Sequence, residues 1–278
     1  MDPVALLKGA LPPIAAALLL VSWRGGRALP VAAALGLYVA FGLLKDWLAW
    51  PHELWAAPNG TSWLVWGVAA LALVAALEHA RLLPARACGG LSAATGAAAL
   101  WLVLDKLAQR WEPLEIALHV GGGGAVVAMS VLCVRGVLAH APRSVAPVAW
   151  FALLLSLDAA LVTLGKSALL GQLCGAVAAA LGAGAGATVW RRGWSLAPAD
   201  GAWIGGAHAL FVLAGVQLGY LEWWPAGCAL AALLPLWALR RAGGGRSWKW
   251  LLVATPASLL LMGAALWLAL PEADPYGY

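Results

Sequence analysis

The feature that most constrains this chain is a series of apolar runs, each near the ~20 residues that a helix needs to cross a lipid bilayer. They recur along the whole sequence, at about 4–22, 29–48, 61–79, 91–109, 119–139, 146–164, 168–190, 202–221, 225–241 and 250–270. Hydrophobic residues make up 63% of the 278 residues, and charged residues only 10%. Backbone polar groups find no water in hydrocarbon, so each run should be helical. The sequence predicts an all-α integral membrane protein, a bundle of about ten transmembrane helices.

The loops between these runs are short, and the longest covers about residues 49–60. No soluble domain fits in any of them, and both polar tails are minimal. We therefore expect residues 1–278 to form a single transmembrane domain. The N-terminus carries no positive charge ahead of its first apolar run, so this run should remain as an anchor and not be cleaved as a signal peptide.

Lysine and arginine are dense in alternate loops, and this predicts the orientation of the chain. The loops after the odd-numbered runs hold Arg24, Arg27, Arg81, Arg86, Arg143, Arg191, Arg192, Arg240, Arg241, Arg246 and Lys249, with Arg135 close to the same side. The opposite loops and helix ends hold only Lys8, Lys45, Lys106, Arg110 and Lys166, but nine of the 12 acidic residues, which are Asp2, Asp46, Glu53, Asp105, Glu112, Glu115, Glu222, Glu272 and Asp274. Because cytoplasmic loops retain positive charge, we predict that the N-terminus and C-terminus both lie on the extracytoplasmic side.

Composition also indicates the partner and the source. The net charge of +5 is spread over short loops, so it suits anionic lipid headgroups and not nucleic acid. Most of the 18 tryptophans lie near the ends of the runs, as expected for an aromatic belt at the lipid–water boundary. Abundant alanine, glycine and arginine are typical of a GC-rich bacterial genome, which predicts the bacterial cytoplasmic (inner) membrane. Other membrane subunits or a second copy of the chain are the protein partners that we expect.

Ten runs divide into two sets of five, which predicts pseudo-repeats over 1–142 and 143–278. Because five is odd, the second set would be inserted upside down, as in many secondary transporters. In size and number of runs the chain resembles the drug/metabolite transporter superfamily, whose members are ten-helix carriers built in this way. The resemblance covers layout only, and the predicted external termini depart from the usual arrangement there. The composition is also similar to that of uncharacterised multi-pass membrane proteins of GC-rich bacteria, which implies no function.

Glycine and proline predict two further features of the bundle. Gly121–Gly124 in the fifth run and Pro256 in the tenth are interruptions at corresponding places, which would suit broken helices around a substrate site. The alternative is that neighbouring helices satisfy the freed backbone groups. Small residues four apart predict close helix contacts in the seventh and eighth runs, against each other or another subunit. These are Gly171 with Gly175, Gly182 with Gly186, Gly201 with Gly205, and Gly215 with Gly219.

Asp158 is the residue that most suggests chemistry. It lies well inside the sixth run, where an ionised carboxylate costs at least about 2.5–3.5 kcal/mol. Lys166 and Gln172 follow toward the outer side, and His208 lies inside the eighth run, so a polar track through these residues is one hypothesis. Asp158 would then couple a proton or cation to transport. The alternatives are an aspartate that fastens two helices together and a histidine that serves packing.

The second candidate cluster lies on the predicted outer rim. It comprises Asp46, His52, Glu53, Asp105, Glu112, Glu115 and His119. Glu115 and His119 are one helical turn apart, a spacing that suits a divalent cation. Lys106 and Arg110 are able to neutralise the same acids, and hydrated loops commonly hold such residues. We therefore assign no metal and no cofactor.

Several enzyme classes are excluded because their motifs are missing. The sequence contains no Gly-x-Ser-x-Gly nucleophile, no His-Glu-x-x-His zinc helix and no phosphate-binding Gly-Lys-Ser/Thr loop. The four cysteines show no paired spacing for zinc or disulfides. We assign no catalytic residue. The favoured hypothesis is a small-solute secondary transporter that uses Asp158, and the alternative is a non-catalytic subunit of a larger membrane complex. An intramembrane transferase acting through the outer acids ranks third.

Overall fold

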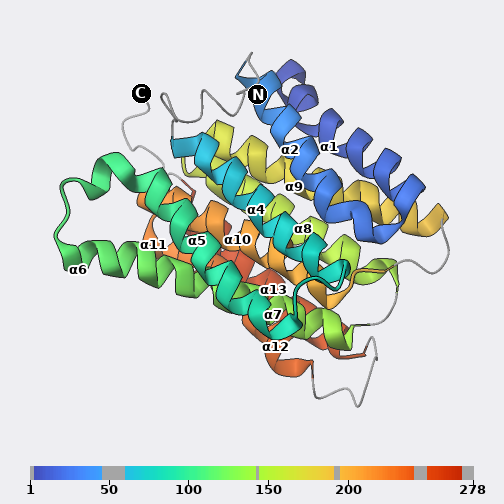
Figure 1. The fold of residues 1–278 in the computed structure, drawn as a ribbon. Coiled ribbons are helices and arrows are strands. Elements are labelled where there is room, and N and C mark those ends of the chain that lie inside the picture. Colours follow the sequence, from blue (N-terminus) through green and yellow to red (C-terminus); the bar gives the residue numbers. More distant parts are fainter. Residues whose placement is uncertain (1–2, 46–59, 142–143, 191–194, 241–248, 271–278) are drawn as a thin grey trace.

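The computed structural model describes residues 3–45, 60–141, 144–190, 195–240 and 249–270, and all of its regular structure within these ranges is helical (Figure 1). The all-α prediction is therefore confirmed. The longer helices are α1 (Pro3–Arg24), α2 (Leu29–Leu44), α4 (Gly60–His79), α5 (Ala85–Ala108), α7 (Gly123–His140), α8 (Val145–Leu164), α9 (Ala168–Trp190), α10 (Gly201–Gln217) and α13 (Lys249–Leu268). The shorter ones are η1 (Gly26–Ala28), α6 (Pro113–Ile116), η2 (Ala117–Gly122), η3 (Pro198–Asp200), α11 (Trp223–Ala231) and α12 (Leu233–Leu239).

Within the described ranges, eight segments are long and apolar enough to cross a membrane. They fall on the first eight predicted runs, so the chain is a multi-pass membrane protein. The last two runs correspond to shorter apolar helices, 223–239 and 252–268. The first of these is divided into α11 and α12 at Ala232, three residues before Pro235. A proline lacks the N–H of a helical hydrogen bond and interferes with the preceding turn, which accounts for the division.

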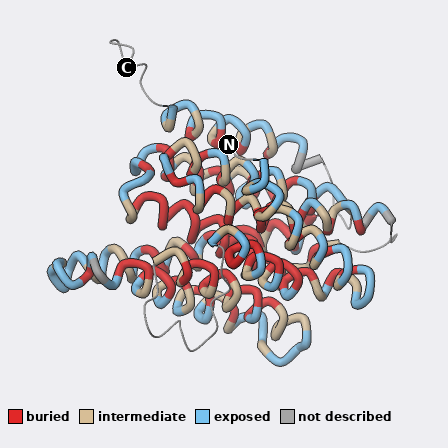
Figure 2. The backbone as a smooth tube through the Cα atoms, turned by 90° about the horizontal axis from the view of Figure 1, so that it is seen from above, coloured by how far each residue is buried: buried red, intermediate tan, exposed pale blue. Residues whose placement is uncertain are grey.

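Helix α10 is the centre of the bundle. All of its residues from Gly201 to Val216 are buried, whereas α1 and α13 on the outside keep broad exposed faces (Figure 2). It packs against α7 and α4 most extensively, and also against α5, α8 and α11. A helix that is apolar on every side belongs inside a bundle. Any polar residue on α10 is therefore held away from both lipid and water.

The other helices surround α10 in two groups. Helices α1, α2, α8 and α9 pack on one another, while α4, α5 and α7 form a second group that contacts α10 directly. Helix α13 packs against α11 and α12. Segments from the two halves of the sequence are therefore interleaved, since α9 lies on α1 and α2, and α10 lies on α4 and α7.

The predicted interruptions at Gly121–Gly124 and Pro256 differ from each other in the structure. Helix α13 runs from Lys249 to Leu268 with Pro256 inside it, so the predicted break there is wrong. A single proline removes one backbone hydrogen bond, and a membrane helix tolerates this loss. At the glycine run, Gly121 and Gly122 end a π-helical turn, η2, and Gly123 and Gly124 begin α7. The Gln217 side chain of α10 donates a 3.0 Å hydrogen bond to the His119 carbonyl of this turn.

Close helix contacts depend on only some of the predicted glycines. A Cβ added at Gly171 would lie 1.9 Å from Thr163 Oγ1 of α8, and one added at Gly205 would lie 2.6 Å from the Ser130 carbonyl oxygen of α7. At Gly182 and Gly186 an added Cβ meets nothing within 4 Å. Helix α9 therefore uses Gly171 against α8, and α10 uses Gly205 against α7.

Gly175, Gly215 and Gly219 lie in looser surroundings than Gly171 and Gly205. A Cβ added at Gly175 would lie 3.8 Å from its nearest neighbour, and one added at Gly215 would lie 3.5 Å away, which are ordinary contact distances. Gly219 has a φ of 76° just beyond the end of α10, a conformation that favours glycine, so its role is in the turn and not in packing. Helices α9 and α10 contact each other only slightly, and each packs far more extensively on another helix, α9 on α8 and α10 on α7.

Candidate functional site

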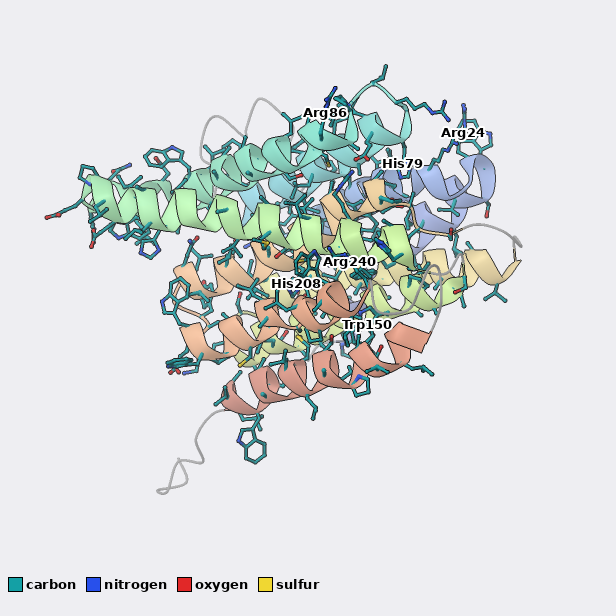
Figure 3. All side chains as sticks on the ribbon, turned by 90° about the horizontal axis from the view of Figure 1, so that it is seen from below. Arg24, His79, Arg86, Trp150, His208 and Arg240 are labelled. Carbon is teal, nitrogen blue, oxygen red and sulfur yellow. The ribbon has the colours of Figure 1, made fainter. Side chains whose placement is uncertain are left out.

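Asp158 and His208 meet in the interior of the bundle. Asp158 is on α8 and His208 is at the middle of α10, and both residues are 0% exposed. The carboxylate Oδ2 and the imidazole Nδ1 are 2.6 Å apart, a short hydrogen bond between a nitrogen and an oxygen. Figure 3 shows His208 in the interior of the molecule. The structure therefore joins two candidates that lie 50 positions apart in the sequence.

Each member of this pair has one atom without a partner. In the part of the chain that the structure describes, neither Oδ1 of Asp158 nor Nε2 of His208 has a hydrogen-bond partner, and both atoms are buried. Buried polar groups in proteins are nearly always hydrogen-bonded, so such atoms call for an explanation. They are the positions where the pair can accept a further proton or contact a water molecule.

Helix α9 closes the third side of the pair. The Cys174 thiol donates a 3.3 Å hydrogen bond to the Leu155 carbonyl, one turn before Asp158 on α8. Both residues are buried. This bond fixes α9 against the same turn of α8 that presents the carboxylate. The thiol bond joins α9 to α8, and the Asp158–His208 pair joins α8 to α10.

The other two residues of the predicted polar track lie apart from this pair. Lys166 is exposed in the turn between α8 and α9, where its φ is 70°. Gln172 lines an apolar groove of about 470 Å³ between α1, α8 and α9, together with Thr163 and Ala159. No hydrogen bond joins Lys166 or Gln172 to Asp158 within the described ranges. Of the residues that line the groove, Ala159 is the nearest to Asp158 in the sequence, because it follows Asp158 directly.

The outer-rim cluster is placed only in part. Asp46, His52 and Glu53 lie outside the described residues. Glu115 accepts a 3.0 Å hydrogen bond from the Glu112 backbone N–H, and His119 stacks on Trp111 with ring centroids 4.6 Å apart. Asp105 is exposed. Among the described residues, no three His, Cys, Asp or Glu side chains gather as they would around a metal ion.

A second ionic cluster, which the sequence reasoning missed, lies at the arginine-rich end of the bundle. Arg135 of α7 forms a two-pronged salt bridge with Glu78 of α4, in which Nη2 and Oε1 are 2.8 Å apart. Next to it, His79 lies 3.1 Å from the Asp200 carboxylate, which also accepts hydrogen bonds from the Trp203 indole and the Ala197 backbone. Asp200 is 1% exposed. This cluster fastens the start of α10 to the ends of α4 and α7.

Comparison with known proteins gives no relative for this chain. No protein-family model matches it, and no match is found among the curated proteins or the solved structures. The site must therefore be interpreted from its own geometry.

Proposed function

We propose that the chain is a small-solute secondary transporter in which Asp158 and His208 form the proton-coupling pair. The observation that carries this proposal is the pair itself, a fully buried carboxylate–imidazole hydrogen bond with one free atom on each residue. Chains of Asp, Glu and His inside membranes are characteristic of proton relays in pumps and transporters.

The protonation chemistry of the pair supports coupling. With one proton shared between Oδ2 and Nδ1, the pair carries a net charge of −1 inside the bundle. A second proton, taken up at Nε2 or Oδ1, makes the pair neutral. Because a buried charge is costly in a medium of low dielectric constant, the contact between α8 and α10 has a different energy in the two states. A difference of this kind is what proton-driven movement of α10 against α8 requires.

The topology that we propose has ten crossings in two inverted sets of five, with both termini on the outer face of a bacterial inner membrane. Two observations support this topology: arginine is dense in alternate loops, and the apolar helices lie at the positions of the ten predicted runs. Arg86→Cys and Arg192→Cys, made in a chain without its native cysteines, should both resist labelling by impermeant thiol reagents added outside. Ready labelling of either position would overturn this orientation.

The coupling proposal is tested by Asp158→Asn in proteoliposomes that contain a pH-sensitive dye. A panel of amino acids, sugars and organic cations is added to a protein-containing membrane, and proton movement is recorded. The unchanged protein should move protons with at least one compound, and Asp158→Asn should abolish the response while retaining the folded protein. Asp105→Asn, an exposed acid outside the pair, is the matched control and should behave as the unchanged protein.

A second measurement separates coupling from packing. Infrared spectra of the protein in nanodiscs should contain a protonated-carboxyl band that changes with pH and is missing in Asp158→Asn. If no compound moves protons and the band does not respond to pH, the pair is a fixed packing contact. The alternative function, a non-catalytic membrane subunit, would then replace transport.

A further inference from the structure

We infer that the arginine-rich end of the bundle holds a binding site for a phosphate group, separate from the Asp158–His208 pair. The site is a cavity of about 800 Å³ between the ends of α1, α4, α5 and α7 and the segment that leads into η3. Four arginines line it, and three of them come from its exposed edge: Arg24 at the end of α1, Arg27 in η1 and Arg81 in the turn after α4. Figure 3 places Arg24 and His79 toward the same side of the molecule.

The floor of this cavity is an ionic layer whose charges are already paired. Arg135 and Glu78 line the cavity and bind each other, with side chains only 11% and 12% exposed. His79 also lines it and contacts Asp200. The floor therefore supplies rigidity more than net charge.

The rim, in contrast, is unneutralised. Arg24, Arg27 and Arg81 are exposed, and no carboxylate within the described ranges forms a salt bridge with any of them. Like charges held around one hollow repel each other, and an anion between them removes this repulsion. Guanidinium groups match the planar, two-oxygen edge of a phosphate, and a phosphate monoester offers three oxygens and close to two negative charges. The chemistry of the rim thus selects a phosphate-bearing ligand.

The backbone at Arg81 adopts a conformation that usually favours glycine. Arg81 has a φ of 61°, a left-handed conformation that is unfavourable for a residue with a Cβ. The hydrogen bonds around it, from the Arg81 N–H to the Glu78 carbonyl and from the Leu82 N–H to the Leu77 carbonyl, are those of a helix end at which glycine is preferred. Unlike a glycine, Arg81 carries a cationic side chain at this helix end, and Arg81 lines the cavity.

The same helix-end geometry recurs at Lys166, which provides a matched control. Its φ is 70°, and the Lys166 and Ser167 N–H groups bond to the Thr163 and Val162 carbonyls in the same pattern. Lys166 is on the turn between α8 and α9 and does not line the arginine-rich cavity. Arg81→Gly and Lys166→Gly each relieve the same backbone strain and remove one cation. Only Arg81→Gly should affect phosphate binding.

Two probes that share one headgroup distinguish a lipid from a soluble ligand. The full chain in detergent is titrated with glycerol 3-phosphate by calorimetry, and with dioleoyl phosphatidic acid by native mass spectrometry. Dioleoyl phosphatidylcholine, whose headgroup has no net charge, is the control lipid. Preference for phosphatidic acid over glycerol 3-phosphate identifies a membrane lipid as the source, and equal affinity identifies a soluble phosphate. Both results support the phosphate site.

Arg81→Gly should weaken binding of the effective probe at least fivefold, since one charge-assisted contact is lost, while the thermal stability stays the same or rises. Lys166→Gly should leave binding within twofold of the unchanged protein. Arg86→Gln is the control at the same end of the bundle, because Arg86 is exposed and outside the cavity. If Arg86→Gln and Arg81→Gly lose saturable binding equally, the binding depends on the general positive charge of this surface and not on the cavity. That result, or failure of both probes to bind, overturns the site.

Discussion

At Gly205, helix α10 lies directly against the backbone of α7, so alanine at this position should destabilise the bundle. A Cβ added at Gly205 would lie 2.6 Å from the Ser130 carbonyl oxygen, 2.8 Å from the Ser130 carbonyl carbon and 2.9 Å from the Val131 Cα. All three are backbone atoms of α7, so no side-chain rotation relieves the clash. Gly205→Ala must therefore separate the two helices, and α10 is enclosed by other helices on its remaining sides.

Gly182→Ala on α9 is the matched comparison. Both positions are inside helices, so alanine gains the same intrinsic helix preference at each, about 1 kcal/mol over glycine. At Gly182 an added Cβ meets nothing within 4 Å, so this gain stands alone. At Gly205 the gain is opposed by overpacking, which typically costs about 1–3 kcal/mol. The difference in unfolding free energy between the two variants therefore isolates the overpacking cost.

The assay is thermal unfolding of both variants and the unchanged protein in the same detergent. Gly182→Ala should melt at the same temperature as the unchanged protein or higher, and Gly205→Ala should melt below Gly182→Ala. Equal melting temperatures for the two variants would refute the backbone contact between α10 and α7. The register of the central helix would then have to differ from the one described.

Two further predictions concern the ionic cluster at the arginine-rich end. Glu78→Gln leaves the Arg135 guanidinium without its countercharge, which costs up to about 3–5 kcal/mol of unfolding free energy if the site stays dry. Glu112→Gln on the exposed rim is the control and should change the melting temperature little. Equal effects of the two variants would mean that the Arg135–Glu78 pair is solvated. Trp203→Phe removes the indole donor 3.2 Å from Asp200 and should lower the unfolding free energy by about 1–3 kcal/mol, measured by the same melting experiment, and an unchanged melting temperature would show that this hydrogen bond is dispensable.

Helix positions were predictable because hydrocarbon permits few alternatives. Every backbone group must be satisfied within the segment, so a long apolar run is a helix whatever its detailed sequence. The division of the ninth run and the continuity of the tenth were not predictable in the same way. Pro235 and Pro256 both lie inside apolar runs, yet α12 is separated from α11 whereas α13 is continuous. Local sequence does not say which neighbouring helix supports the backbone around a proline.

Helix partners were even less predictable than helix positions. Small residues four apart are able to mark a contact, but the sequence does not show what they contact. Gly171 and Gly182 belong to the same helix and to the same kind of pattern, and only Gly171 meets a neighbour closely. Packing between helices depends on the arrangement of the whole bundle, and α9 lies against α8 and α1.

The distribution of acidic residues in the sequence indicates both the Asp158–His208 pair and the ionic cluster at the arginine-rich end. Nine of the 12 acids follow the charge alternation of the loops, and the other three are Glu78, Asp158 and Asp200. In the structure each of these three contacts a base on another helix: Arg135, His208 and His79 respectively. An acid that departs from the alternation lies inside a span or at the arginine-rich end, where it is stable only with a partner. These exceptions were visible in the sequence, but their partners lie 50 to 121 positions away and only the fold identifies them.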